Sequence, residues 1–220
     1  MIVPYHLNKE EKASKLLARL NELTKIHVKN NQEYKAMLEK SGLKVEAQYL
    51  EEVPFLPVQM FKLIDLVSVP KEEVVKVLTS SGTTGQQVSK IYLDKETSLA
   101  QTKTLVEVMK PLLGSKRLPM IILDNKSVLK NRKSFSARGA GILGFSNFGR
   151  KHFYALNDDM SLDLEGLNNY LEKYKGQRIL LFGFTFIIWE YVYKETIRRG
   201  IKLDFGDSLL IHGGGWKKLK

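Results

Sequence analysis

Arg178-Ile-Leu-Leu-Phe182 is a continuous apolar run, typical of a strand that is buried on both faces of a parallel sheet. A helical segment follows from Thr185 to Arg199 and ends at Gly200. The next strand lies within Ile201 to Ile211 and leads into His212-Gly-Gly-Gly215. Because strand and helix alternate here, the sequence predicts an α/β fold with a mainly parallel sheet flanked by helices.

The N-terminal part of the chain has a different pattern. Between Asn8 and Lys40 the apolar residues recur at helical spacing, and Ser41-Gly42 is a helix stop. We therefore expect a helical region over residues 1–50 and a second region, the α/β part, over residues 51–220. Within the latter, Val74 to Leu78 and Ser89 to Leu93 are expected to form a strand-loop-strand hairpin.

Four further segments complete the expected order of elements. Thr97 to Leu113 is predicted to be a helix, and Met120 to Leu123 a strand that stops at Asp124-Asn125. Glycines over residues 139–149 predict a flexible stretch. Leu162 to Tyr174 is predicted to be a short helix closed by Gly176.

Composition excludes several classes of protein. The chain of 220 residues is 43% hydrophobic, enough for a buried core, and it contains no cysteine. Disulfides, cysteine zinc sites and a cysteine nucleophile are therefore excluded within it, and its four histidines show no metal-ligand spacing. The N-terminus lacks a signal pattern, and the apolar stretch Ile179 to Trp189 is too short to cross a bilayer. We expect a soluble, cytoplasmic protein that does not bind membranes.

The net charge is +11, with a pI near 9.6. It indicates either a solvated basic surface or an anionic ligand such as a nucleotide. One local cluster comprises Lys126, Lys130, Arg132, Lys133 and Arg138. No zinc-finger, RRM or KH signature accompanies it, so DNA is not an expected partner, and nucleic-acid binding stays an alternative.

The densest motif is a run of small and hydroxyl residues between the two hairpin strands. Glycine allows main-chain N–H groups to approach phosphate oxygens, and hydroxyl groups donate further hydrogen bonds. The run lacks the Gly-Lys ending of a Walker A loop, and an ordinary polar turn is the alternative. We expect it, together with the following lysine, to bind ATP phosphates through Thr79, Ser80, Ser81, Gly82, Thr83, Thr84, Gly85 and Lys90.

This run resembles the phosphate-binding loop of the adenylate-forming superfamily. Five other motifs together resemble the acyl-protein synthetase (LuxE) family. They are Val53–Val58 with Phe61-Lys62, Ser136–Gly141, Gly144–Gly149, Gly183–Phe186 and His212–Lys217. The superfamily places Pro-Lys two residues after the last glycine, whereas this chain has Lys90 further on, which departs from the mainstream acyl-CoA synthetases.

The resemblance implies the N-terminal portion of a ligase. The reaction would join ATP and a carboxylic acid, of the fatty-acid class, into an acyl-adenylate, with Mg²⁺ on the phosphates. The acyl group would pass to a thiol on the protein, an acyl carrier, coenzyme A or a partner acyl reductase. The family's remaining ATP contacts and acceptor cysteine would follow residue 220, so we expect this chain alone to be inactive. The alternative is a non-catalytic nucleotide-binding fragment.

The resemblance also implies two further sets of site residues. His212, Gly213, Gly214 and Gly215 would lie against adenine, with a plain tight turn as the alternative. Arg138, Gly139, Phe184 and Phe186 would form the acyl and carboxylate pocket. For these the alternatives are an exposed arginine and ordinary core packing. No catalytic residue and no metal ligand is assigned.

Overall fold

The computed structural model describes residues 6–80, 87–129 and 134–216. The chain divides into two compact units, Met1–Glu107 and Val108–Lys220, called unit 1 and unit 2 below. Each unit is described by itself. The boundary between a helical region and an α/β region, expected after residue 50, stays a prediction.

Unit 1 begins with two helices, α1 (Lys9–Asn30) and α2 (Gln32–Ser41). Asn8 caps α1 in a reciprocal capping box with Glu11, which satisfies two of the free N–H groups at the helix start. Asn31 separates the helices, because its side chain accepts the Tyr34 N–H at 2.7 Å and starts α2. Gly42 ends α2 with φ +65°, a conformation that suits glycine. The N-terminal helices and their stop are confirmed.

The rest of unit 1 contains short helices and a hairpin. The short helices are η1 (Leu50–Glu52), α3 (Met60–Leu63) and η2 (Lys71–Glu73). Strands β1 (Val74–Thr79) and β2 (Lys90–Asp94) pair antiparallel, with Thr79 opposite Lys90. The expected hairpin is confirmed, and helix α4 (Lys95–Leu113) follows β2 directly.

Unit 2 is built on a four-stranded sheet in which every pairing is parallel. Its order is β5-β3-β6-β7, and the strands are β3 (Leu118–Asn125), β5 (Gly149–Leu156), β6 (Ile179–Phe184) and β7 (Ser208–Gly213). The predicted α/β fold with a parallel sheet is therefore confirmed. Between β3 and the next helix the chain forms η3 (Lys126–Leu129) and β4 (Ser134–Ser136).

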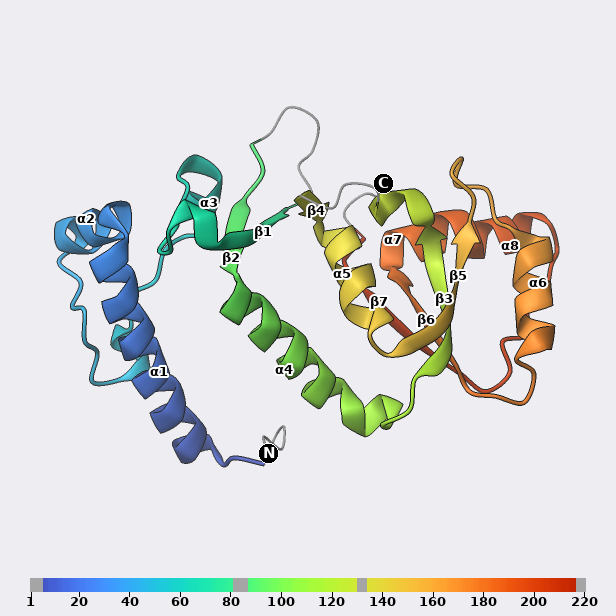
Figure 1. The fold of residues 1–220 in the computed structure, drawn as a ribbon, viewed down its shortest axis with the longest axis horizontal. Helices are drawn as coiled ribbons and strands as arrows, with labels where there is room; N and C mark the ends of the chain where they lie inside the picture. The colour runs from blue at the N-terminus through green and yellow to red at the C-terminus, as the bar shows by residue number, and fades with distance from the viewer. Residues whose placement is uncertain (1–5, 81–86, 130–133, 217–220) are drawn as a thin grey trace. The chain divides into compact units, whose positions relative to one another are not determined.

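The helices that connect these strands cover both faces of the sheet. Helix α5 (Ala137–Ser146) joins β3 to β5, and α6 (Leu164–Lys173) joins β5 to β6. Figure 1 shows α5 and α6 on opposite sides of the strands. The connection from β6 to β7 is one continuous helical path made of α7 (Thr185–Ile187), the π-helix η4 (Ile188–Tyr193) and α8 (Lys194–Arg198).

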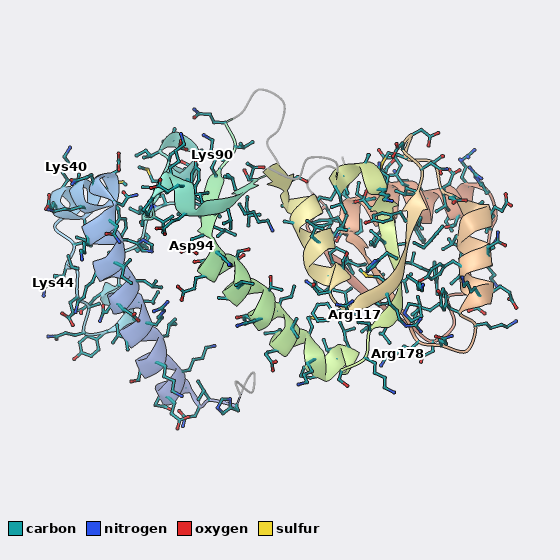
Figure 2. All side chains as sticks on the ribbon, viewed as in Figure 1. Lys40, Lys44, Lys90, Asp94, Arg117 and Arg178 are labelled. Carbon is teal, nitrogen blue, oxygen red and sulfur yellow. The ribbon has the colours of Figure 1, made fainter. Side chains whose placement is uncertain are left out.

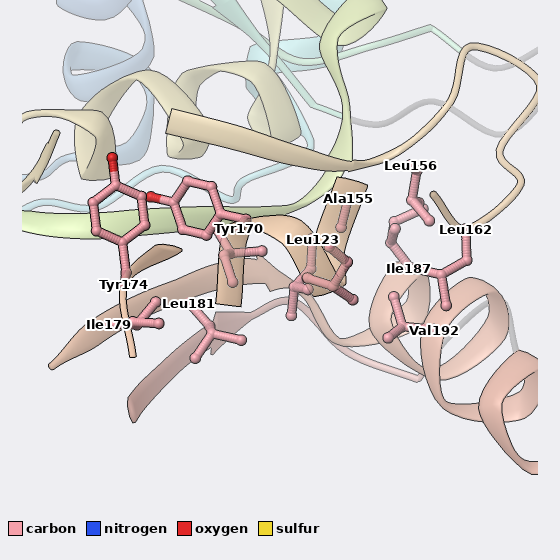
Figure 3. Packing of buried hydrophobic residues seen from close by; sticks show 12 residues of the cluster. Leu123, Ala155, Leu156, Leu162, Tyr170, Tyr174, Ile179, Leu181, Ile187 and Val192 are labelled. Carbon is pink, nitrogen blue, oxygen red and sulfur yellow. The ribbon is translucent and has the colours of Figure 1, made fainter. Parts of the chain in front are cut away.

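The main core lies on the α6 side of the sheet. It contains side chains of β3, β5 and β6, and Figure 3 shows how they lie. Tyr170 of α6, Tyr174 directly after α6, and Ile187 and Val192 of the helical path after β6 pack against them. The central strand β3 is buried on both faces, since Met120, Ile121 and Ile122 are completely inaccessible to solvent. This explains why the strand is a continuous apolar run in the sequence.

One sequence expectation is wrong. The glycine-rich stretch over residues 139–149 is not a flexible segment, because it forms helix α5 and the first residue of strand β5. Ser136 caps the helix by accepting the Gly139 N–H at 3.2 Å. Gly141 allows close packing, since a Cβ there would lie 3.0 Å from Cζ of Phe184. Packing against the sheet thus overrides the low helix propensity of glycine.

Candidate functional site

The carboxyl edge of the sheet in unit 2 brings several of the expected site residues to one level. Ile122 pairs with Phe182, which pairs with Ile211, and two residues further along each strand come Asp124, Phe184 and Gly213. Because strand side chains alternate, these three positions share one face of the sheet. Contacts of Phe182 and Phe184 with α5 residues identify it as the α5 face.

The topology marks the same place. The chain leaves β3 toward β5 at one side of the sheet, and it leaves β6 toward β7 at the other side. Ligands of open parallel sheets bind at such a switch point, beyond the carboxyl ends of the strands. Adjacent strands β3 and β6 end here, at Asn125 and Phe184.

Asp124 and Arg138 form an ion pair at this switch point. The Asp124 side chain is fully buried, and its Oδ1 accepts the Asn125 N–H at 2.7 Å and Nη2 of Arg138 at 2.9 Å. Nε of Arg138 lies 2.8 Å from Oδ2, yet the N–H is not aligned for a hydrogen bond, so both atoms lack one. The contact is therefore a charge pair with one well-formed hydrogen bond.

Burial controls the electrostatics of this pair. Loss of solvent raises the pKa of Asp124 above its ordinary value, although the charge of Arg138 and two hydrogen bonds oppose the rise. Tyr154 on β5 lies beside Ile122 in the sheet, and burial followed by the charge of Asp124 raises its pKa too. The edge is therefore a poorly solvated place with one buried acid and one guanidinium.

Arg138 is paired on one side only. Its side chain keeps 32% of its surface exposed, and within the described part of the chain Nη1 has no hydrogen-bond partner. Gly139, the next expected residue, is buried in α5, and its N–H already bonds to Ser136. At the start of α5, the group available to a ligand is thus the edge of the Arg138 guanidinium that carries Nη1.

His212 and Gly213, expected in a loop after the strand, are the last residues of β7, and Thr185 binds them together with Gly214. Oγ1 of Thr185 lies 2.9 Å from Nδ1 of His212, 3.0 Å from the carbonyl of Gly213 and 3.2 Å from that of Gly214. Carbonyl groups only accept, and a hydroxyl carries one proton. The three contacts fit one another best when Nδ1 of His212 donates to Oγ1 and Oγ1 donates its single proton to one of the two carbonyls. This arrangement leaves Nε2 of His212 as an acceptor.

The loop also packs against the aromatic ring at the end of β6. Gly214 has φ +82°, and a Cβ there would lie 3.1 Å from Cδ1 of Phe184. Both features require glycine at this position. Gly215 follows in an exposed position, with nothing within 4 Å of an added Cβ.

The two expected pocket phenylalanines have different neighbours. Phe184 meets Phe182 edge-on at 6.0 Å, and Phe182 stacks on Phe145 of α5 at 4.3 Å. Phe186 instead meets Tyr191 of the π-helix edge-on at 6.4 Å. The aromatic rings on the face that carries Asp124 are therefore Phe184 and the two rings behind it, Phe182 and Phe145.

The expected phosphate-binding residues belong to unit 1, and Ser81, Gly82, Thr83, Thr84 and Gly85 lie outside the described residues. Ser80 closes the hairpin, because its N–H donates to the Ser89 carbonyl at 3.1 Å and its Oγ accepts the Ser89 N–H at 2.9 Å. Thr79 is the last residue of β1.

Lys90, labelled in Figure 2, has an acidic neighbour. Its Nζ lies 3.1 Å from Oδ1 of Asp65, and both side chains are about half exposed. The hydrogen bond to Asp65 raises the pKa of Lys90, and the same bond lowers the pKa of Asp65. Lys90 is therefore charged and tethered to a carboxylate.

In unit 2 the structure brings together two groups of expected site residues. One is His212–Gly215, expected to lie against adenine, and the other is Arg138 with Phe184. Sequence reasoning assigned no role to Asp124, Thr185 or Tyr154. Asp124 could have been noticed, because a carboxylate directly after the apolar run Met120–Leu123 ends a buried strand. For Thr185 and Tyr154 the sequence holds no comparable signal.

Two cavities lie away from this edge. One of about 530 Å³ borders Tyr174, Gln177 and Phe205 in unit 2, and one of about 280 Å³ borders His27 and Ser68 in unit 1. Neither contains an expected site residue. Among the described residues there is no cluster of three or more metal-ligating side chains, and no helix is long and apolar enough to cross a bilayer.

Replacing Thr185 with Val should loosen the glycine loop. The variant keeps the shape of the side chain but loses the hydroxyl that joins His212, Gly213 and Gly214. We expect Gly213 and Gly214 amide hydrogens to exchange faster by about three- to ten-fold, the effect of one lost hydrogen bond. Thr196→Val, at a partly exposed threonine whose hydroxyl donates to the Tyr193 carbonyl, is the control and should leave these two amides unchanged.

Comparisons with known proteins agree with the resemblance of the motifs. A family model described as "Acyl-protein synthetase, LuxE" matches residues 2–220. Among curated proteins, the long-chain-fatty-acid–luciferin-component ligase of Vibrio harveyi is 26% identical over 210 residues. This alignment covers 87% of the chain and 50% of the relative, so the chain spans about half the length of the ligase that it matches.

Proposed function

Because the chain belongs to the acyl-protein synthetase (LuxE) family, we propose that it binds acid and nucleotide in an ATP-dependent ligase. The ligase activates a carboxylic acid, of the fatty-acid class named for the Vibrio relative, to an acyl-adenylate. The observation that supports this most is the partly exposed Arg138, which pairs with Asp124 level with Phe184 at the switch point of the parallel sheet.

The acid would lie with its carboxylate on the free edge of Arg138. A guanidinium in a poorly solvated place favours an anionic group over a neutral one. The acyl chain would contact Phe184, whose ring is partly buried, and Gly139 and Phe186 would complete the walls. Apolar walls with a few oriented polar groups are typical of ligand sites.

Two sets of residues are proposed to contact ATP, one in each unit. The glycine loop at His212–Gly215 offers a flat backbone for adenine, and the run Thr79–Gly85 with Lys90 would hold the phosphates. Mg²⁺ would be held largely by the phosphates, since it retains waters and needs few protein ligands. When bound, Mg²⁺ neutralises phosphate charge.

The distribution of charge supports an anionic ligand. Unit 2 contains 20 lysines and arginines against 10 aspartates and glutamates, whereas unit 1 contains 15 against 14. Nearly all of the net positive charge thus belongs to unit 2, which carries the residues proposed to contact adenine and the substrate acid. A positive unit attracts ATP and carboxylates and raises their rate of association.

The acyl acceptor would be a thiol outside these 220 residues, because they contain no cysteine. A cysteine elsewhere in the protein, an acyl carrier or coenzyme A would supply it. A partner acyl reductase is the proposed destination of the acyl group.

Calorimetry with two matched ligands tests the acid site. Decanoate and 1-decanol have the same alkyl chain and differ in the charged group, so we expect the chain to bind decanoate more tightly. The expected preference is about ten-fold, the scale of one charge-assisted hydrogen bond. Equal binding of both ligands contradicts the proposed acid site.

A thermal-shift series tests the nucleotide site. ATP with Mg²⁺ should raise the melting temperature, because a ligand that binds only the folded state stabilises it. Gly85→Val should reduce this shift, since a β-branched side chain blocks close approach of phosphate to the backbone. Gly176→Val, at a glycine after α6, is the matched control. A shift with an oligonucleotide and none with ATP would favour the nucleic-acid alternative.

A further inference from the structure

Asp124 is held in place by burial and by a hydrogen bond from the backbone. It lies on the central strand of the sheet with its side chain fully buried, and the Asn125 N–H holds Oδ1 at 2.7 Å. Its carboxylate is therefore a fixed anchor in a place with little solvent.

Arg138 is directed by this anchor. Nη2 and Nε of the guanidinium face the two oxygens of Asp124 at 2.9 and 2.8 Å. An arginine side chain has many rotamers, and a planar guanidinium that donates through Nη2 and lies in ion-pair contact through Nε retains few of them. The third nitrogen, Nη1, must then point away from Asp124.

One nitrogen of the guanidinium takes no part in the pair. Within the described residues no protein group bonds to Nη1 of Arg138. The side chain also keeps 32% of its surface exposed, while its anchor keeps none. The arrangement thus leaves one donor of Arg138 available, and Asp124, its anchor, lies level with Phe184 on the adjacent strand.

We propose that Asp124 is a positioning residue that holds Arg138 with Nη1 turned toward the carboxylate of the substrate acid. This proposal rests on the proposed function, in which Arg138 meets that carboxylate. Its energetic basis is preorganisation: a guanidinium that is already oriented loses less freedom when the acid binds. Asp124 itself does not touch the substrate.

The test compares decanoate with 1-decanol on variants of Asp124. Asp124→Asn keeps the shape of the side chain but loses its charge, and Asp124→Glu keeps the charge but moves the oxygens by one methylene. In each variant we expect decanoate to bind about ten-fold more weakly, the size of one charge-assisted hydrogen bond. Binding of 1-decanol should stay within about two-fold of wild type, since the alcohol does not need the oriented guanidinium.

Two controls separate positioning from folding. Asp207→Asn removes an exposed carboxylate, 73% accessible, from its pair with Arg178 and should leave both ligands unaffected. Tryptophan fluorescence shows whether each variant is folded, because Trp189 and Trp216 both belong to unit 2. Having two Asp124 variants keeps the test valid if one of them does not fold.

Four outcomes are informative. Unchanged decanoate binding in a folded Asp124 variant overturns the proposal, and so does an equal loss for both ligands, which indicates a structural role alone. Adding Asp124→Asn to Arg138→Lys should cause no further loss of decanoate affinity, because the effect acts through the guanidinium. A wild-type protein without preference for decanoate contradicts the proposed function instead.

Discussion

Arg138→Met is expected to destabilise unit 2 strongly at neutral pH, by about 3–5 kcal/mol. The substitution removes the cation and leaves the fully buried carboxylate of Asp124 without its partner. The measurement is urea unfolding followed by tryptophan fluorescence, since both tryptophans report on unit 2. Arg178→Met is the matched control, because Arg178 pairs with Asp207 at 3.8 Å on the surface. Breaking such an exposed pair costs about 0–1 kcal/mol.

The destabilisation should depend on pH in a defined direction. Burial already raises the pKa of Asp124 above its ordinary value of 3.8, and loss of Arg138 raises it further. An acid whose pKa is higher in the folded state contributes stability that is present below the unfolded pKa. This stability is lost as the pH rises through the folded pKa.

The difference between Arg138→Met and wild type should therefore be small near pH 4 and grow toward neutral pH. Tyr154 also faces Asp124, but its pKa is raised from an ordinary value of 10, so it does not titrate in this range. A difference that stays constant with pH would show that Asp124 is not an uncompensated buried charge in the variant.

The same pair illustrates what the sequence could and could not predict. Strand β6 and its following helix were predicted because an apolar run and a closing glycine are local signals. The contact between Asp124 and Arg138 joins residues 14 positions apart across two elements. Their pairing depends on how α5 packs on the sheet, which no local pattern specifies.

Strand β5 was not predicted for a similar reason. It is an edge strand, and residues 150–152 near its start are exposed and polar, so the segment lacks a continuous apolar run. Its glycine at position 149 is required by packing, because an added Cβ would collide with Met120 on β3. The sequence shows this glycine but not the neighbour that makes it necessary.

The spacing of apolar residues also does not predict the π-helix after β6. The helical path was expected from Thr185 to Arg199, and the structure has helix there, but Ile188–Tyr193 is wound more widely. Ile188 packs against Gly183, where a Cβ would lie 3.0 Å from its Cγ1, and Trp189 stacks on Tyr193 at 4.7 Å. Such bulges are frequent at functional sites, and this one begins four residues after Phe184.

Phe182→Ala is expected to destabilise unit 2 about as strongly as Arg138→Met, but by a different mechanism. Phe182 is 3% exposed, stacks on Phe145 at 4.3 Å and supports Phe184 edge-on at 6.0 Å. Truncation removes buried apolar surface and leaves a cavity on the α5 face, which costs about 3–5 kcal/mol. Leu210→Ala on neighbouring strand β7 is the control, since that side chain is 45% exposed and should cost less than about 1 kcal/mol.

The same variant separates packing from charge at the edge of the sheet. Phe182 carries no titratable group, so its destabilisation should not change between pH 4 and neutral pH, unlike that of Arg138→Met. Without the ring behind it, Phe184 should lose its fixed position, and both decanoate and 1-decanol should then bind more weakly. Urea unfolding of Phe182→Ala and Leu210→Ala, followed through Trp189 and Trp216, measures the stability. Equal losses in the two variants would show that the aromatic stack does not hold the edge of the sheet in place.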